Sequence, residues 1–478
     1  MSVFRRKLFS QIATQQRDRQ LVRSLRWPHL IALGIGAIVG TGIYTLIGVG
    51  ANLAGPGFLL SFLIAGIICA CTALAYAELS TMIPVAGSTY TYTYLTLGEP
   101  IAWIVGWSLI LEYSLVVSTV AVGWSGYFVG FLDWIHQVTG IHCTLPTAWT
   151  AGPHAGGIFN LPAVVITLIV AAVLINGTRR SATFNIALVI IKLLALVLFI
   201  LVTVPSFQHA HFIPFMPYGF SGHIGPDHVK RGVMAAAAIV FFAFYGFDAI
   251  STAAEETQNP KRHLTIGIIG SMVCCTLIYM AVGAAAIGAV PYELFSASSE
   301  PLALILRYVH QDWAAAISST SAVIALPTVI FAFMYGQTRV FFVMSRDGLL
   351  PRQLSMVNKK TGTPIAVTSF TAFVVAILAG LVPLDEVAAL ANTGTLVAFT
   401  SVSLCMLVLR VTESQRPRLF RAPLAWLIGP VAILGCIYLF FNLPTRTQQW
   451  FVKWNSIGLI VYLAYGRWHS VLNKKQAN

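Results

Sequence analysis

Charged residues are scarce in this chain of 478 residues: Asp, Glu, Lys and Arg make up 9% of it, whereas 57% of the residues are hydrophobic. Ordinary globular proteins carry roughly 25% charged residues, so this chain has too little charge to cover a surface that faces water. Disorder is excluded as well, because a disordered chain needs low hydrophobicity and high net charge. The composition therefore predicts an integral membrane protein with many spans.

Motifs for nucleotide binding and metal catalysis are missing too. The sequence has no Gly-Lys dipeptide, and therefore no G-x-x-x-x-G-K-[ST] phosphate loop, and it has no H-E-x-x-H pair. The seven cysteines show no paired metal spacing and are expected to pack as small apolar residues. We therefore expect no metal and no cofactor, and a secondary transporter rather than an enzyme or an ATP-driven pump.

Apolar runs of the length that crosses a bilayer, about 20 residues, recur along the whole chain. They predict an all-α integral membrane protein with twelve spans. The runs cover approximately residues 30–52, 58–80, 101–131, 160–177, 184–205, 232–252, 265–290, 314–343, 365–382, 387–409, 424–443 and 451–469.

The basic residues predict the orientation of these spans, because Lys and Arg are retained in cytoplasmic loops. With the N-terminus inside, 23 of the 29 basic residues fall in cytoplasmic segments and five in outer segments. We therefore expect a multi-pass protein of the cytoplasmic (inner) membrane with both termini in the cytoplasm. The net charge of +13 then reflects topology, and no nucleic-acid partner is needed to explain it. The one remaining basic residue is Lys192, inside the fifth run.

Glycines interrupt two of the runs. The first run places four glycines between Gly34 and Gly42, and each costs about 1 kcal/mol relative to alanine in a helix interior. One interpretation is close helix packing through Gly36 and Gly40; the other is an unwound segment at Gly40-Thr41-Gly42. The sixth run again carries a glycine, Gly246. Interruptions at corresponding positions of two five-span halves indicate an inverted-repeat transporter, although the residues themselves show no repeat.

Helix ends at such interruptions suit a zwitterionic ligand. Free N–H groups and a positive dipole end at Thr41 and Gly42 would bind a carboxylate, and unpaired carbonyl groups would bind an ammonium group. We therefore expect a site for the backbone of an α-amino acid that uses no side-chain charge. The expected carbonyl groups are those of Ile38, Val39, Phe242, Ala243 and Tyr245, beside Gly40.

Ionisable residues at membrane depth are functional candidates. Lys192 has two readings: a buried lysine can exchange a proton near neutral pH, or it stays protonated and holds carbonyls of the broken first span. Glu112 is a partner for Lys192, a contact for a cationic substrate side chain, or a protonated core group. Asp248 is expected to cap the second half of the sixth span, and it shares with Glu112 a candidate role in specificity or coupling. Glu78 is expected to join a structural ion pair.

Several stretches resemble the cationic amino acid transporter family of the amino acid-polyamine-organocation superfamily, in its bacterial twelve-span type. Together they run from about residue 30 to residue 470. The matching stretches are 34–44, 76–80, 84–92, 97–99, 106–107, 111–113, Asn185 with Lys192, 241–260, 337–339, 346–351 and 394–396.

The resemblance implies a leucine-transporter-like fold: a 5+5 inverted repeat with broken first and sixth helices, plus two additional C-terminal helices. It also implies amino acid transport driven by protons or by exchange. In such families a lysine matching Lys192 is proposed as the proton-coupling group, and aromatics matching Phe242 form an inner lid. One departure is the stretch 263–267, where the family commonly has an acidic residue and a proline. Bacterial members also favour neutral amino acids, so the family name does not assign a substrate.

Together these features predict a proton-coupled symporter of L-amino acids, cationic or small neutral, that works by alternating access. The alternatives are an amino acid or polyamine exchanger with the same fold and, less favoured, a non-transporting sensor. Expected partners are the amino acid, protons and lipid; a small single-span accessory subunit is not evident. The expected segments are a basic N-terminal segment (1–28), a first repeat (29–205), an outer loop (206–230), a second repeat (231–410), two accessory spans (411–469) and a tail (470–478).

Overall fold

The computed structural model describes residues 5–6, 26–83, 88–141, 144–176, 182–225, 229–252, 257–356, 358 and 364–473, and every structural statement below concerns these residues. They are overwhelmingly helical. The strands in them are β1 (His223–Ile224) and β2 (Lys230–Arg231), which pair antiparallel with Ile224 opposite Lys230. The remaining parts of the chain, which include Glu255, Glu256 and most of the basic segment 1–28, lie outside the described residues.

Long apolar helices dominate the described part of the chain. Seven are long and apolar enough to cross a membrane: Leu46–Met82, Glu99–Thr139, Ile186–Ser206, Arg262–Ala289, Asp312–Arg346, Leu384–Thr412 and Ala425–Asn442. Shorter apolar helices cover Trp27–Ile38, Leu161–Ile175, Val233–Phe244 and Ile365–Leu381. Such lengths and compositions are those of membrane spans.

Helix bounds follow ordinary capping chemistry. Helix α7 (Glu99–Thr139) begins after Gly98 and carries Pro100 in its first turn, where a missing N–H costs nothing. It ends at Gly140, whose φ of 71° is left-handed and whose N–H bonds back to His136 over 2.9 Å. Other helices are α4 (Leu46–Ala54), α6 (Ser88–Thr96), α9 (Ala182–Thr203), α13 (Tyr292–Phe295), α14 (Pro301–Tyr308), α19 (Thr445–Val461) and α20 (Arg467–His469).

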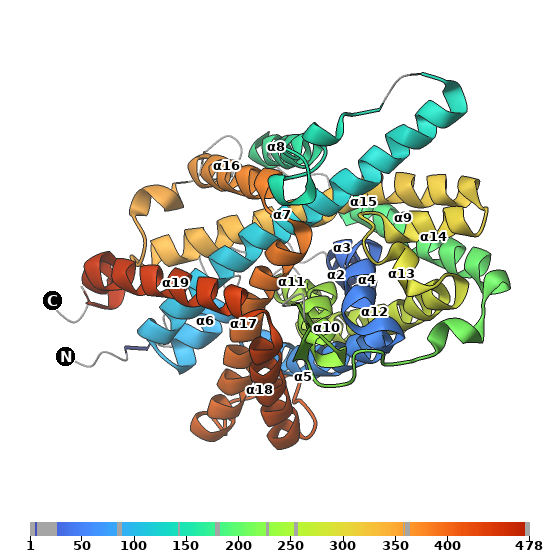
Figure 1. Cartoon of the computed structure of the whole chain (residues 1–478). Coiled ribbons are helices and arrows are strands. Elements are labelled where there is room, and N and C mark those ends of the chain that lie inside the picture. Colours follow the sequence, from blue (N-terminus) through green and yellow to red (C-terminus); the bar gives the residue numbers. More distant parts are fainter. Residues whose placement is uncertain are drawn as a thin grey trace.

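The long helices surround a short, broken pair (Figure 1). Helix α7 packs along α15 (Asp312–Arg346), and α8 (Leu161–Asn176) packs on α16 (Ile365–Leu381). Helix α12 (Pro260–Ala289) contacts both α5 (Phe58–Met82) and α2 (Trp27–Ile38), while α17 (Leu384–Thr412) contacts α7 and α18 (Ala425–Asn442). The broken helices lie in the middle of this arrangement, so their interruptions are shielded from the lipid-facing surface.

The first interruption lies slightly earlier than expected. Helix α2 ends at Ile38, Val39 and Gly40 have non-helical backbone angles, and α3 (Thr41–Tyr44) begins at Thr41. The expected unwound segment Gly40-Thr41-Gly42 is therefore wrong for Thr41 and Gly42, which form the first turn of α3. A Cβ atom on Gly42 would collide with Ala243. Glycine is needed at that position for a close helix crossing, and not for unwinding.

The second interruption lies at the expected glycine. Helix α10 (Val233–Val240) tightens into a 3₁₀ turn at Phe241–Phe244, and α11 (Phe247–Thr252) begins after Tyr245 and Gly246. Gly246 has a φ of 107°, a conformation that favours glycine. The helical structure is therefore interrupted at Tyr245 and Gly246, and both residues stay buried.

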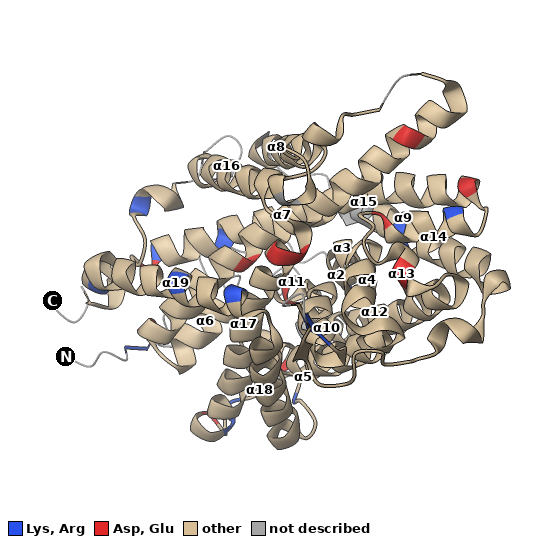
Figure 2. Cartoon of the chain, viewed as in Figure 1, with Lys and Arg blue, Asp and Glu red and all other residues tan. Residues whose placement is uncertain are grey.

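Charged side chains are few along the helical ribbon (Figure 2). Glu78 on α5 is buried and accepts hydrogen bonds from Arg410 over 2.8 Å and from Arg418 over 3.0 Å. The backbone N–H of Ala422 donates to the same carboxylate. The expectation of an ion pair at Glu78 is thus confirmed, and this carboxylate joins α5 to the end of α17.

Candidate functional site

A small cavity lies between the two interruptions. Four parts of the chain supply its walls: the α2–α3 junction, the interruption of the sixth run, α7 and α15. The lining residues are Ala37, Ile38, Gly40, Thr41, Gly42, Val116, Val120, Phe242, Tyr245, Val329 and Phe333. The cavity therefore contains six of the eight residues expected at the binding site; Val39 and Ala243 are not among its lining.

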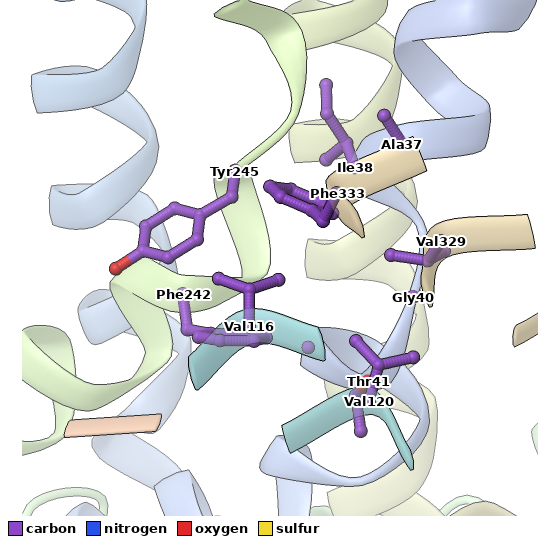
Figure 3. Close-up of a pocket in the computed structure, with 11 residues that line it drawn as sticks. Ala37, Ile38, Gly40, Thr41, Val116, Val120, Phe242, Tyr245, Val329 and Phe333 are labelled. Carbon is purple, nitrogen blue, oxygen red and sulfur yellow. The ribbon is translucent and has the colours of Figure 1, made fainter. Parts of the chain in front are cut away.

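Two pairs of apolar side chains close the cavity opposite the broken helices (Figure 3). Val116 and Val120 are one turn apart on α7, and Val329 and Phe333 are one turn apart on α15. Residues four apart lie on the same helix face. The spacing alone marks an apolar face of each helix, but it does not distinguish a cavity wall from a lipid-facing or core position, so the sequence did not reveal these four residues.

The lining holds no charged side chain. Its polar side chains are Thr41 and Tyr245. The hydroxyl oxygen of Thr41 is fully buried and has no hydrogen-bond partner among the described residues. Buried polar groups are normally paired, so this hydroxyl is free to receive a ligand's polar group.

The main chain beside Thr41 offers donors. The N–H groups of Ile43 and Tyr44 both bond to the carbonyl of Gly40, over 3.2 and 3.3 Å. The N–H groups that precede them, at Thr41 and Gly42, belong to the first turn of α3, where an N–H has no acceptor within the helix. Donors and the Thr41 hydroxyl thus lie on one side of the cavity.

The carbonyl groups on the other side are partly engaged already. The Tyr279 hydroxyl on α12 lies 2.8 Å from the carbonyl oxygen of Ile38 and 2.9 Å from that of Ala243. Since a hydroxyl has one proton, it donates to one of them at a time. Tyr279 therefore ties the end of the first broken helix to the end of the second.

Lys192 lies against the end of α2. Its ammonium group, fully buried on α9, donates to the carbonyl of Gly36 over 2.9 Å and to that of Val39 over 3.1 Å. These carbonyls belong to the C-terminal end of α2, where a positive charge is favourable. The bonds fit both readings of Lys192, the proton-exchanging group and the structural ammonium. The interpretation that pairs Lys192 with Glu112 is wrong, because no ion pair joins these two described residues and Glu112 Oε2 has no hydrogen-bond partner among the described residues.

Glu112 and Asp248 form a separate buried group. The Tyr113 hydroxyl donates to a carboxylate oxygen of Asp248 over 3.1 Å. Asp248 lies in the first turn of α11, and its capping of that helix stays a prediction. Glu112 is buried on α7, and its Oε2 has no hydrogen-bond partner within the described part of the chain. Neither carboxylate lines the cavity, so neither is placed to meet the side chain of a ligand there.

The sequence was compared with protein families and with characterised proteins. Residues 25–465 match the family described as amino acid permease. This chain belongs to the amino acid permease family. The resemblance to cationic amino acid transporters is also confirmed. The chain is 36% identical over 418 residues to cationic amino acid transporter 3, mitochondrial, of Arabidopsis thaliana, and the matched region covers 86% of this chain and 66% of that protein.

Two bacterial relatives cover the permease almost completely. The chain is 46% identical over 478 residues to the branched-chain amino acid permease BcaP of Bacillus subtilis, covering 99% of each protein. It is 40% identical over 476 residues to the methylthioribose transporter of the same organism, covering 99% of this chain and 100% of the relative. The family and its members are transporters, and with the apolar helices they make this chain a multi-pass membrane protein.

Proposed function

We propose that this permease is a proton-coupled symporter of neutral L-amino acids with branched aliphatic side chains. The observation that carries the proposal is the lining of the cavity, where Val116, Val120, Val329 and Phe333 present apolar surface and no side chain carries a charge. A cationic side chain would lose its hydration there without gaining a partner. An aliphatic one would gain roughly 25 cal/mol for each Å² of apolar surface removed from water.

The backbone of the substrate meets the two interruptions. Its carboxylate accepts from the Thr41 hydroxyl and from the first N–H groups of α3. Its ammonium group donates to the carbonyls of Phe242 and Tyr245. It also donates to the Ile38 carbonyl, because that oxygen has two lone pairs and the Tyr279 hydroxyl uses only one of them. Any α-amino acid offers these two groups, so side-chain selection falls to the apolar walls.

Proton coupling is assigned to Lys192. Its ammonium group holds two carbonyls, those of Gly36 and Val39, at the interruption that forms one wall of the cavity. Release of a proton weakens that hold and changes the geometry of the wall. The proton and the substrate thereby act on the same stretch of main chain, which is what coupling requires.

The architecture proposed for this function is the leucine-transporter-like 5+5 inverted repeat, with twelve spans in the cytoplasmic membrane and both termini inside. The chain ends support it: the main-chain oxygen of Arg5 accepts from the N–H of Glu99, and the Ser470 hydroxyl donates to the Glu99 carboxylate over 2.5 Å. Ends that meet at one residue lie on one face, as an even number of spans demands. The repeats are residues 29–205 and 231–410, followed by two accessory spans.

Uptake into proteoliposomes tests the proposal. Radiolabelled leucine, isoleucine, valine, alanine and arginine are offered with and without an inward proton gradient. We expect accumulation of the branched-chain amino acids only with the gradient. Uptake of arginine in preference to leucine contradicts the assigned substrate class, and counterflow without accumulation assigns the protein as an exchanger.

A second substrate class is tested in the same assay, because the match to the methylthioribose transporter covers as much of this chain as the match to BcaP does. Methylthioribose has neither a carboxylate nor an ammonium group, so it does not use both interruptions. We expect unlabelled methylthioribose in excess to leave leucine uptake unchanged. Competition at concentrations similar to those of leucine would favour this sugar derivative instead.

A further inference from the structure

Tyr245 contributes its ring to the cavity but directs its hydroxyl away from Thr41 and Phe333 (Figure 3). The hydroxyl donates to the side-chain oxygen of Asn392 on α17. Asn392 is fully buried and does not line the cavity. The orientation of one wall of the cavity therefore depends on a residue of a different helix.

The amide nitrogen of Asn392 has a second function. It donates to the carbonyl of Ala238 over 2.6 Å and to that of Ile239 over 3.0 Å. Both carbonyls belong to the last turn of α10, where regular helical hydrogen bonding ends and a 3₁₀ turn begins. The two N–H groups and the oxygen of this amide are thus all used, a combination that only an amide side chain provides.

Through these three bonds Asn392 joins the end of α10 to the ring of Tyr245. Tyr245 lies seven residues after Ala238 and six after Ile239 in the chain. The ring is packed beside Phe242, with centroids 5.0 Å apart, and beside Phe241, with centroids 5.9 Å apart. Aromatic packing restricts the ring, but the bond from its hydroxyl to Asn392 sets how far it extends toward the cavity. Loss of the amide would remove three hydrogen bonds from a buried place, and the Ile239 carbonyl would keep only the N–H of Phe241.

We infer that Asn392 is a positioning residue for substrate binding: it holds the Tyr245 ring as a wall of the cavity and thereby sets the affinity for large aliphatic side chains. The inference rests on the transport function proposed above. Asn392 acts through Tyr245 and does not touch the substrate. Its effect falls on KM, and more on leucine than on alanine, because the smaller side chain of alanine reaches the wall less.

The test is a double-mutant cycle in proteoliposomes with Asn392→Leu, Tyr245→Phe and the double variant. Asn392→Leu keeps the size of the side chain and removes its hydrogen bonds. We expect it to raise the KM for leucine about tenfold, the effect of losing a neutral hydrogen bond in a buried site, with a smaller change in kcat. The KM for alanine changes less. Because both residues act through one bond, the double variant has a leucine KM close to that of the more affected single variant.

Thr393→Val is the matched control. Thr393 is the neighbouring residue on α17, is equally buried, and donates only to Leu390 of its own helix. We expect its leucine KM to equal that of the parent. A role of Asn392 in folding alone would lower the yield of folded protein while leaving the ratio of the leucine and alanine KM values unchanged, and that outcome overturns the inference. The inference is also overturned if the effects of Asn392→Leu and Tyr245→Phe on the leucine KM simply multiply in the double variant.

If Asn392→Leu yields no folded protein, Tyr245→Phe alone decides. It keeps the ring and removes the bond to Asn392, so an unchanged leucine KM overturns the inference. Failure of the proposed function is recognised separately, because the parent protein then takes up no amino acid in the same vesicles.

Discussion

Gly246 packs directly on Ala37, so that a Cβ atom on Gly246 would lie 2.6 Å from the Cβ atom of Ala37. Gly42 packs in the same manner on Ala243. Each interruption thus places a glycine against a small residue of the other broken helix. These two contacts bring the main chains of the broken helices close together beside the cavity.

Substitution of Gly246 by alanine should therefore be severely destabilising. The new methyl group collides with Ala37, and the φ of 107° strains any residue with a Cβ atom. We expect a large loss of thermal stability in detergent and no uptake. Gly140→Ala is the control, because Gly140 also has a left-handed φ, of 71°, but open space around it. It should cost only about 1 kcal/mol of backbone strain; equal losses in the two variants would contradict the close crossing.

Gly40→Ala should narrow the cavity without breaking the helices. A Cβ atom there lies 3.3 Å from a methyl group of Val329, which is tight contact that the side chain can relieve only by shifting. We expect the KM for leucine to rise more than the KM for alanine. Adding Val329→Ala removes the obstructing methyl groups and should restore leucine uptake toward the parent value. If the second substitution gives no recovery, the two residues do not face each other across the substrate.

Lys192→Met should separate binding from coupling. Methionine retains much of the apolar chain and removes the ammonium group that holds Gly36 and Val39. We expect accumulation driven by the proton gradient to be lost while exchange of internal for external leucine remains measurable. Tyr279→Phe is the control, since it also removes a donor from carbonyls of the broken helices but no charge. It should weaken binding and preserve gradient dependence. Accumulation by Lys192→Met at the level of the parent would refute the coupling role.

Glu78→Gln tests the buried ion pair at the end of α17. The substitution leaves Arg410 and Arg418 without their carboxylate, and breaking a buried pair costs about 3–5 kcal/mol. We expect a correspondingly lower free energy of unfolding. The control is Glu413→Gln, which removes a partly exposed pair with Arg416. Its N–O distance is 3.6 Å, and a pair near the surface contributes at most about 1 kcal/mol. Similar stabilities for the two variants would show that the buried pair is dispensable.

Local sequence pattern predicted much of the fold. The apolar run 160–177 became α8, the run 58–80 became α5, and the glycine-marked interruptions appear in the first and sixth runs. Each depends on composition over a short stretch of chain, because the main chain satisfies its hydrogen bonds within each helix in an apolar environment. The carboxylate of Glu78 was also interpretable, since a charge at that depth requires a partner.

The walls of the cavity were beyond such prediction. Val116 with Val120, and Val329 with Phe333, repeat every four residues as any apolar helix face does, and only the packing of α7 and α15 around the interruptions turns those faces inward. The close approach of Gly42 in α3 to Ala243 likewise joins residues that lie some 200 positions apart in the chain.

The sequence by itself determined that this protein is helical, lies in a membrane and has two weak points where helices break, because each of these follows from the free energy of short segments in lipid. Tertiary structure alone decided what the breaks enclose. It removed Glu112 and Asp248 from the cavity, engaged the carbonyls of Ile38 and Ala243 with Tyr279, and linked Tyr245 to Asn392. Such contacts join residues distant in sequence, so the geometry of the packed helices, and no local preference, selects them.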